Sequence, residues 1–131
     1  AANPESLPHF FPLVKQHGAL LAKGRLQGVQ FLTLFKDGLY VKMCKHAVSL
    51  AMKLRDGFAA CGLPAAVDSK TNQQFFLLPN GLCDSLRESG ISFEDWGPRG
   101  DTHTTVRFVI SWATSDEDVD KLLELVGKLT R

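Results

Sequence analysis

Apolar residues recur at three- and four-residue steps between residues 39 and 61, which is the spacing of one face of an α-helix. Polar and charged side chains occupy the other faces of this segment. Gly62 and Pro64 follow directly, and glycine is typical of a left-handed helix cap whereas proline cannot continue a helix. The pattern predicts a long amphipathic helix that ends near Cys61. Its apolar positions are Met43, Ala47, Leu50, Leu54, Phe58 and Cys61.

A short helix is expected near the beginning of the chain. Asn3, Pro4 and Glu5 are typical of a helix start, because asparagine can cap, proline tolerates the first helical position and glutamate favours the positive end of the helix dipole. Pro8 and Pro12 each lack an amide hydrogen, so we expect this helix to be short or bent.

Helical spacing returns between residues 18 and 35, where the apolar positions are Leu21, Val29, Leu32 and Phe35. Gly24 and Gly28 lie among them and leave a groove without side chains. A neighbouring helix, a second subunit or a ligand could approach such a groove closely. The Lys-Asp-Gly sequence at 36–38 predicts the end of this helix.

Short apolar and alternating runs replace the helical pattern after residue 62, and turn residues separate them. The predicted order is a strand at 73–78, a turn at 79–81, a short helix at 82–88, an alternating segment at 91–96, a turn at 97–100, a strand at 102–112 and a terminal helix. In the last strand one face carries Val106, Phe108, Ile110 and Trp112, and the other carries Thr105, Arg107, Val109 and Ser111.

Residues 114–117 have the spacing of a capping box, which predicts the start of the terminal helix. The apolar stripe of that helix is Val119, Leu122, Leu123 and Val126. The order of elements predicts an α+β fold, with a small antiparallel or mixed sheet, helices on one face of it, and linking helices before it. We expect linking helices in residues 1–38 and the small α+β domain in residues 39–131.

Composition and charge mainly exclude functions. In the 131 residues, 15 Lys and Arg face 14 Asp and Glu without a long basic run, so nucleic-acid binding is not expected. No apolar stretch approaches the roughly 20 residues of a membrane-spanning helix. Three widely spaced cysteines, without C-x-x-C, favour a reducing and therefore cytoplasmic compartment. The four histidines lack the spacing of a zinc site, and no metal is predicted.

Two arginines are candidates for ligand binding. Arg25 lies in the apolar stripe beside Gly24 and Gly28, where it could hold a phosphate or carboxylate, or reach solvent or an internal acid instead. Arg107 lies on the polar face of a strand, where it could hold a carboxylate in a bidentate manner or be merely solvated. The pattern leaves both pairs of alternatives open. Trp96 and Trp112 are expected to serve packing or a subunit interface.

Three segments in order resemble the C-terminal third of the threonine aldolase and β-eliminating lyase family. They are residues 15–35 (KQHGALLAKGRLQGVQFLTLF), residues 71–73 (TNQ) and residues 106–114 (VRFVISWAT). In this family of fold type I pyridoxal-phosphate enzymes, a large α/β domain carries the cofactor lysine and a smaller α+β domain closes one side of the site. The resemblance implies a carbon–carbon lyase that converts a β-hydroxy amino acid to glycine and an aldehyde.

The resemblance also implies roles for particular residues. Arg107, in a segment similar to the family's R-x-V-T-S-W, would hold the α-carboxylate of the substrate, although Ile110 replaces the family's threonine. Arg25, and Lys23 beside it, would bind the phosphate of pyridoxal 5'-phosphate. The intact enzyme would be a homo-oligomer, a dimer or a tetramer, that also contains the large domain.

The family's cofactor lysine and its other cofactor contacts lie upstream of the first matching segment. We therefore assign no catalytic residue to this chain and expect it alone to be an inactive fragment, in agreement with its start at Ala1 without a methionine. Two alternatives from other classes are a free-standing α+β module that binds a small carboxylate through Arg107, and an oligomerisation module that uses the Gly24 and Gly28 groove.

Overall fold

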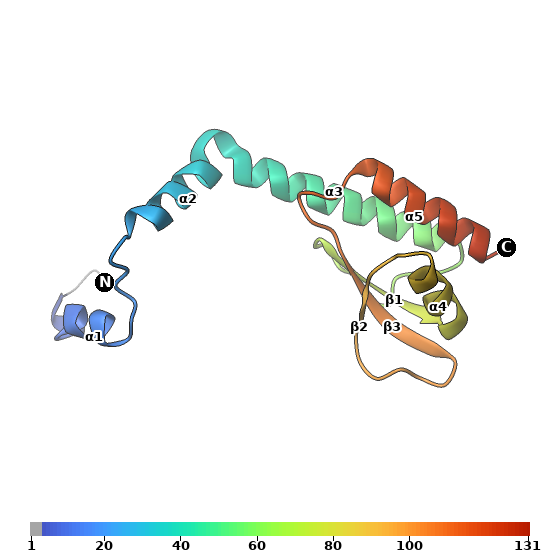
Figure 1. Cartoon of the computed structure of the whole chain (residues 1–131), viewed down its shortest axis with the longest axis horizontal. Coiled ribbons are helices and arrows are strands. Elements are labelled where there is room, and N and C mark those ends of the chain that lie inside the picture. Colours follow the sequence, from blue (N-terminus) through green and yellow to red (C-terminus); the bar gives the residue numbers. More distant parts are fainter. Residues whose placement is uncertain (1–3) are drawn as a thin grey trace. The chain divides into compact units, whose positions relative to one another are not determined.

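The computed structural model describes residues 4–131, which form two compact units (Figure 1). The first unit ends at Tyr40 and the second runs from Val41 to Arg131. Asn3, the predicted helix cap, lies outside the described residues. No helix in the described part is long and apolar enough to cross a membrane.

The first unit consists of short helices without a core of its own. Its elements are the 3-10 turn η1 (Pro4–Ser6), α1 (Phe10–Gln16), α2 (Arg25–Phe35) and the 3-10 turn η2 (Lys36–Gly38). Among residues 5–40 no side chain is buried. Pro8 interrupts the first segment as expected, because regular helix resumes only at Phe10, whereas Pro12 lies in the first turn of α1, where a missing amide hydrogen costs no helical hydrogen bond.

The helix predicted from residue 18 is shorter than the pattern suggested. Gly18 has a φ of 68°, in the left-handed region that ends a helix, and residues 19–24 form turns and irregular backbone before α2 begins at Arg25. The predicted end of this helix is confirmed, since Asp37 and Gly38 have φ angles of 55° and 68°. A helix start at Gly18 was therefore wrong, and Gly24 is the cap of α2 instead of an interior residue.

The second unit is a three-stranded antiparallel sheet with helices packed on one face, which confirms the predicted α+β fold. Its strands are β1 (Gln73–Pro79), β2 (Glu94–Asp95) and β3 (His103–Val109), in the spatial order β1-β3-β2. Its helices are α3 (Leu39–Ala60, which begins two residues before the unit boundary), α4 (Asn80–Glu88) and α5 (Asp116–Leu129). Figure 1 shows α3 and α5 lying beside the sheet.

Several boundaries differ from the sequence prediction. Asn80 and Gly81 belong to α4 instead of a turn, and the alternating segment at 91–96 forms only the two-residue strand β2. The capping box lies one residue later than predicted, with the Ser115 side chain accepting from the Asp118 amide and Asp118 accepting from the Ser115 amide. Such one-residue shifts are common at helix ends, where neighbouring polar residues compete to cap.

Aromatic side chains form the centre of the core. The ring centroid of Phe58 on α3 lies 4.3 Å from that of Phe76 on β1 and 5.5 Å from that of Phe108 on β3. Val106, Phe108 and Ile110 are buried as predicted, whereas Trp112 is 65% exposed. Trp112 leaves the predicted face because β3 ends at Val109 and the chain turns at 111–114, where the Thr114 amide donates to the Ser111 carbonyl.

Replacing Phe58 with alanine should lower the free energy of unfolding by about 3–5 kcal/mol, because the change leaves a cavity between α3 and the sheet. Urea unfolding of the 131-residue chain measures the loss. Leu77→Ala, at a side chain that is 52% exposed on the opposite face of the sheet, should cost less than about 1 kcal/mol. Equal losses for the two variants would show that Phe58 does not organise the core.

Candidate functional site

Arg107 lies at the middle of the outer face of the sheet, opposite the face that packs on the helices. In the register of the sheet its partners are Phe75 on β1 and Glu94 on β2. Because β3 is the central strand, both neighbours flank the arginine directly. Alternation along β3 buries Val106 and Phe108 and leaves the Arg107 side chain 20% exposed. The predicted polar face is therefore confirmed, but the arginine is not simply solvated.

Three side chains hold the guanidinium group of Arg107. Its Cζ lies 4.5 Å from the centroid of the Trp96 ring, so the flat cation stacks on an aromatic face. One terminal nitrogen donates to Gln73 Oε1 at 3.2 Å, and the other donates to the carboxylate of Glu94. Arg107 Nε is buried and has no hydrogen-bond partner among the described residues. The group is thus fixed in orientation while one donor stays unused.

Glu94 and Trp96 were not predicted as site residues. The alternating pattern at 91–96 places both on one face of a strand, but only the register with β3 shows that this face meets Arg107. The Trp96 amide donates to the Thr105 carbonyl at 2.8 Å, and its ring packs edge-on against Phe75 with centroids 5.4 Å apart. Trp96 therefore closes one side of the arginine.

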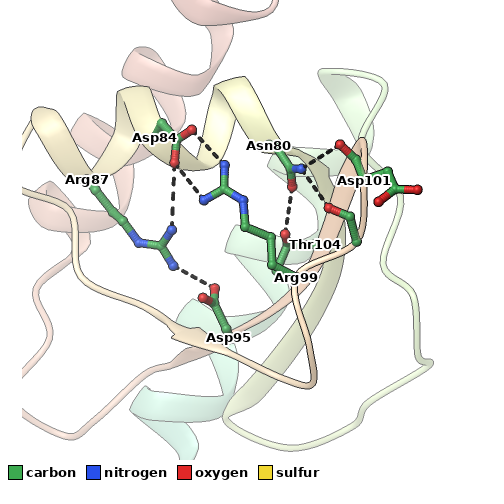
Figure 2. Close-up of polar contacts among 8 residues, drawn as sticks. Asn80, Asp84, Arg87, Asp95, Arg99, Asp101 and Thr104 are labelled. Carbon is green, nitrogen blue, oxygen red and sulfur yellow. Dashed lines mark hydrogen bonds and ion pairs between the residues drawn. The ribbon is translucent and has the colours of Figure 1, made fainter.

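A polar network fastens the loop that follows Trp96 to the start of α4 (Figure 2). Asn80 Nδ2 donates to the carbonyl oxygens of Gly100 and Asp101 at 2.9 and 3.2 Å, and Asn80 Oδ1 accepts from Thr104 Oγ1 at 2.7 Å. Asparagine can donate and accept at once, so a single side chain joins the loop to β3. This loop connects β2 to β3.

Ion pairs extend the same network to β2 (Figure 2). Both terminal nitrogens of Arg99 donate to the two oxygens of Asp84 on α4, at 2.9 and 2.7 Å. Arg87, also on α4, donates to Asp95 at 2.6 Å and stacks on Phe93. Asp95 points to the α4 side of the strand while its neighbour Glu94 points to Arg107. Helix α4 therefore positions the short strand that supplies Glu94.

The Arg99 hydrogen bonds hold the pKa of the Asp84 carboxyl below its ordinary value of 3.8, and the same pair raises the pKa of Arg99. Both groups are exposed, so solvent screens their attraction. The pair mainly fixes the position of the loop that carries Arg99, because its contact with Asp84 is bidentate.

Lys23 and Arg25 lie together in the first unit, around the N-terminus of α2. Both line a shallow surface hollow with Gly24, Leu26 and Val29 among its walls. Neither side chain forms an ion pair with a residue in the described range 4–131. Two cations beside the positive end of the α2 dipole suit an anion. The family resemblance assigned both residues to one anion site, and that role stays a prediction; Arg107 belongs to the second unit.

Comparison with solved structures relates this geometry to known enzymes. The chain superposes on Leishmania major threonine aldolase with a TM-score of 0.87 and 34% sequence identity, over 95% of this chain and 36% of that one. The chain has the fold of part of a threonine aldolase. It spans about a third of the length of that protein, so the match to threonine aldolase describes a portion of the enzyme.

Two more distant structures share the fold. The first is Sphingomonas wittichii serine palmitoyltransferase, which has 18% sequence identity and a TM-score of 0.55 over 66% of this chain and 24% of that one. The second is the 8-amino-7-oxononanoate synthase of Francisella tularensis, which has 17% sequence identity and a TM-score of 0.57 over 79% of this chain and 30% of that one. No protein-family model and no curated protein sequence matches the chain. The relation of this chain to threonine aldolase therefore rests on the match to the Leishmania major structure.

Replacing Asp84 with asparagine should make stability less dependent on pH. A carboxylate whose pKa is lowered in the folded state stabilises it above the unfolded value, near 3.9, and this contribution disappears as the pH falls through the folded value. Urea unfolding should therefore show the parent more stable than Asp84→Asn at pH 7, with the difference shrinking below about pH 4.

Glu88→Gln is the matched control for this measurement, since Glu88 is exposed on the same helix and forms no ion pair within the described part of the chain. Its difference from the parent should stay small over the whole pH range. A difference between parent and Asp84→Asn that is constant with pH would contradict the role of the Arg99 contact.

Proposed function

We propose that this chain is the substrate-carboxylate-binding portion of a pyridoxal-phosphate-dependent lyase of the threonine aldolase type. The observation that carries the proposal is the oriented guanidinium of Arg107 in a fold that matches part of a threonine aldolase. The substrate is a β-hydroxy amino acid, and the products are glycine and an aldehyde. The other two thirds of the enzyme supply the cofactor lysine.

Arg107 suits an α-carboxylate for two reasons. Its planar fork can donate two parallel hydrogen bonds to one carboxylate, which fixes the direction of the bound acid as well as its position. Stacking on Trp96 and the contact with Gln73 hold the fork in place before a ligand arrives, so less freedom is lost on binding. A substrate held in this way presents its α-carbon at one defined place.

Lys23 and Arg25 fit the phosphate group of the cofactor. A phosphate carries about two negative charges, and two cations beside the N-terminus of α2 match that charge. We assign to them the binding of the phosphate, with Gly24 between them leaving room for close approach. Pyridoxal phosphate, when bound, withdraws electron density as the bond between the α- and β-carbons breaks. Arg107 contributes by aligning that bond.

The exposed apolar side chains of the first unit support a partner for this region. Phe10, Phe11, Leu26, Phe31 and Leu32 are 51–65% exposed, and short helices of this kind are not stable without packing. We infer that residues 1–38 link the small domain in residues 39–131 to the large domain of the enzyme, which covers these side chains. From the family resemblance and the cysteine pattern, we further propose that the intact enzyme is a homo-oligomer in the cytoplasm.

A second function rests on the fact that Arg107 and the side chains that hold it all belong to the second unit. This arrangement would also serve a module that binds a small carboxylate without catalysis. Lyase activity of the intact protein, lost when Arg107 is changed, separates the two functions.

In the intact protein, Arg107→Ala should lower kcat/KM for a β-hydroxy amino acid by about 100-fold or more, the equivalent of losing a charged contact of about 3 kcal/mol. Steady-state release of aldehyde measures the change. Arg107→Lys keeps the charge but not the fork and should retain an intermediate rate. Arg55→Ala removes an α3 arginine that pairs with Asp56 and Asp68 and takes no part in the Arg107 cluster, so it should stay within about twofold of the parent. Near-normal kinetics for Arg107→Ala would refute the assignment.

The 131-residue chain mixed with pyridoxal phosphate should show neither aldehyde release nor a stoichiometric lysine-bound absorbance band, because the residue that binds the cofactor covalently lies in the remainder of the enzyme. The intact protein should show both. Absorbance titration of the two proteins side by side makes the comparison. A saturable band at one cofactor per chain in the 131-residue protein would show that it carries the cofactor lysine itself.

A further inference from the structure

Arg107 already contacts a carboxylate in this chain. Glu94, directly opposite it on β2, accepts a hydrogen bond from one of its terminal nitrogens. The Glu94 side chain is 64% exposed, whereas that of Arg107 is 20% exposed. The acid therefore reaches over the arginine from the solvent side, and a ligand that approaches from solvent meets Glu94 first.

The physical role of such a contact follows from the burial of the arginine. Its guanidinium stacks on Trp96 and donates to Gln73, and a cation that is mostly removed from water is costly without an anionic partner. Glu94 supplies that partner while giving up little hydration, because most of its side chain stays in water. Because the Glu94 carboxylate lies mostly in water, its attraction to Arg107 is screened on that side, and the pair is weaker than a fully buried one.

The unused hydrogen-bond donor of Arg107 indicates that another carboxylate could replace Glu94. Glu94 uses one terminal nitrogen, and Nε is buried without a partner. Nε and a terminal nitrogen lie along one edge of the guanidinium and can donate two parallel hydrogen bonds to one carboxylate. An incoming carboxylate that takes this edge gains a bond that Glu94 does not make, and it satisfies a buried donor.

The backbone around Glu94 can allow such an exchange. β2 contains only two residues, lies at the edge of the sheet, and pairs with β3 alone. Its position is held by contacts that do not involve the Glu94 side chain: Asp95 accepts from Arg87, and the Trp96 amide donates to the Thr105 carbonyl of β3. The Glu94 side chain can therefore swing into solvent without disturbing the anchors of the strand.

We propose that Glu94 is an internal, displaceable carboxylate that occupies Arg107 in the empty site and gives way to the carboxylate of the substrate. This inference rests on the proposed function, because it takes Arg107 as the carboxylate-binding group. Glu94 is then a specificity-determining residue: it keeps Arg107 paired when no ligand is bound, and it sets the affinity threshold that a monodentate or weakly held anion fails to pass.

The test uses the 131-residue chain with the Trp112→Phe change, so that Trp96 is its sole tryptophan. Sodium acetate is titrated against sodium chloride at matched ionic strength, and Trp96 fluorescence together with the Arg107 Nε–H signal in NMR reports binding. The Arg107 signal is the one that is absent from Arg107→Lys. Thermal unfolding confirms that each variant is folded.

Glu94→Gln should bind acetate about three- to fivefold more tightly than the parent, the range expected for removal of an exposed competing ion pair. Glu94→Asp, whose shorter side chain holds Arg107 less well, should lie between them and replaces Glu94→Gln if that variant does not fold. Asp101→Asn removes the same charge from the neighbouring loop without touching Arg107, so its affinity should equal that of the parent within about 1.5-fold.

The remaining outcomes separate this inference from the proposed function. If Arg107→Lys loses acetate binding while Glu94→Gln binds like the parent, Glu94 does not compete, and Arg107 is still the carboxylate site. If Asp101→Asn raises the affinity for acetate as much as Glu94→Gln does, the change in affinity comes from the net charge of the protein, and the inference fails. Acetate binding that is indifferent to Arg107→Lys, or absent from every variant, overturns both the inference and the role of Arg107.

Discussion

The antiparallel pairing of β1 with β3 is the constraint on which the second unit depends. Phe76 lies opposite Val106 on the buried face, and Phe75 lies opposite Arg107 on the outer face. Because side chains alternate along a strand, burying the first pair forces the second pair outward. The packing of Phe58 against Phe76 thus determines where the arginine lies, although the two features are on opposite sides of the sheet. A slip of one residue would bury the cation and expose the aromatic core.

The chemistry of the outer face follows from this placement. An arginine surrounded by Phe75 and Trp96 is partly removed from water, so its hydrogen bonds are stronger and its unpaired donor is more costly than on an open surface. Gln73 and Glu94 satisfy two of the nitrogens and leave Nε free. The site is therefore both oriented and incomplete, a combination suited to binding a small anion.

Helix α4 connects the core to this site. Its inner face contributes Leu82, Cys83 and Leu86 to the core, while Asn80, Asp84 and Arg87 hold β2 and the loop before β3. The helix is short and depends on its packing for stability. Tertiary burial of one face consequently positions the polar contacts of the other, and through them Trp96 and Glu94.

The sequence alone determined the features that depend on neighbours along the chain. Periodicity located the buried face of α3, the apolar face of β3 and the stripe of α5, and Gly62 and Pro64 located the end of α3, because these patterns reflect local geometry. It also singled out Arg107 and Arg25 by their residue type and face, and it indicated the family through the order of three segments. The predictions of a helix from residue 18 and of a buried Trp112 were wrong, because the apolar periodicity continued past turns in the backbone.

Only the tertiary structure decided which side chains meet across strands. The pairing of Glu94 with Arg107, separated by 13 positions, and the fastening of the Gly100 loop by Asn80 follow from the strand register and the docking of α4. No local pattern encodes that register, because it is selected by burial of the whole apolar face at once. The sequence thus showed an arginine on the polar face of a strand, whereas only the fold determined its partners and left its Nε without one.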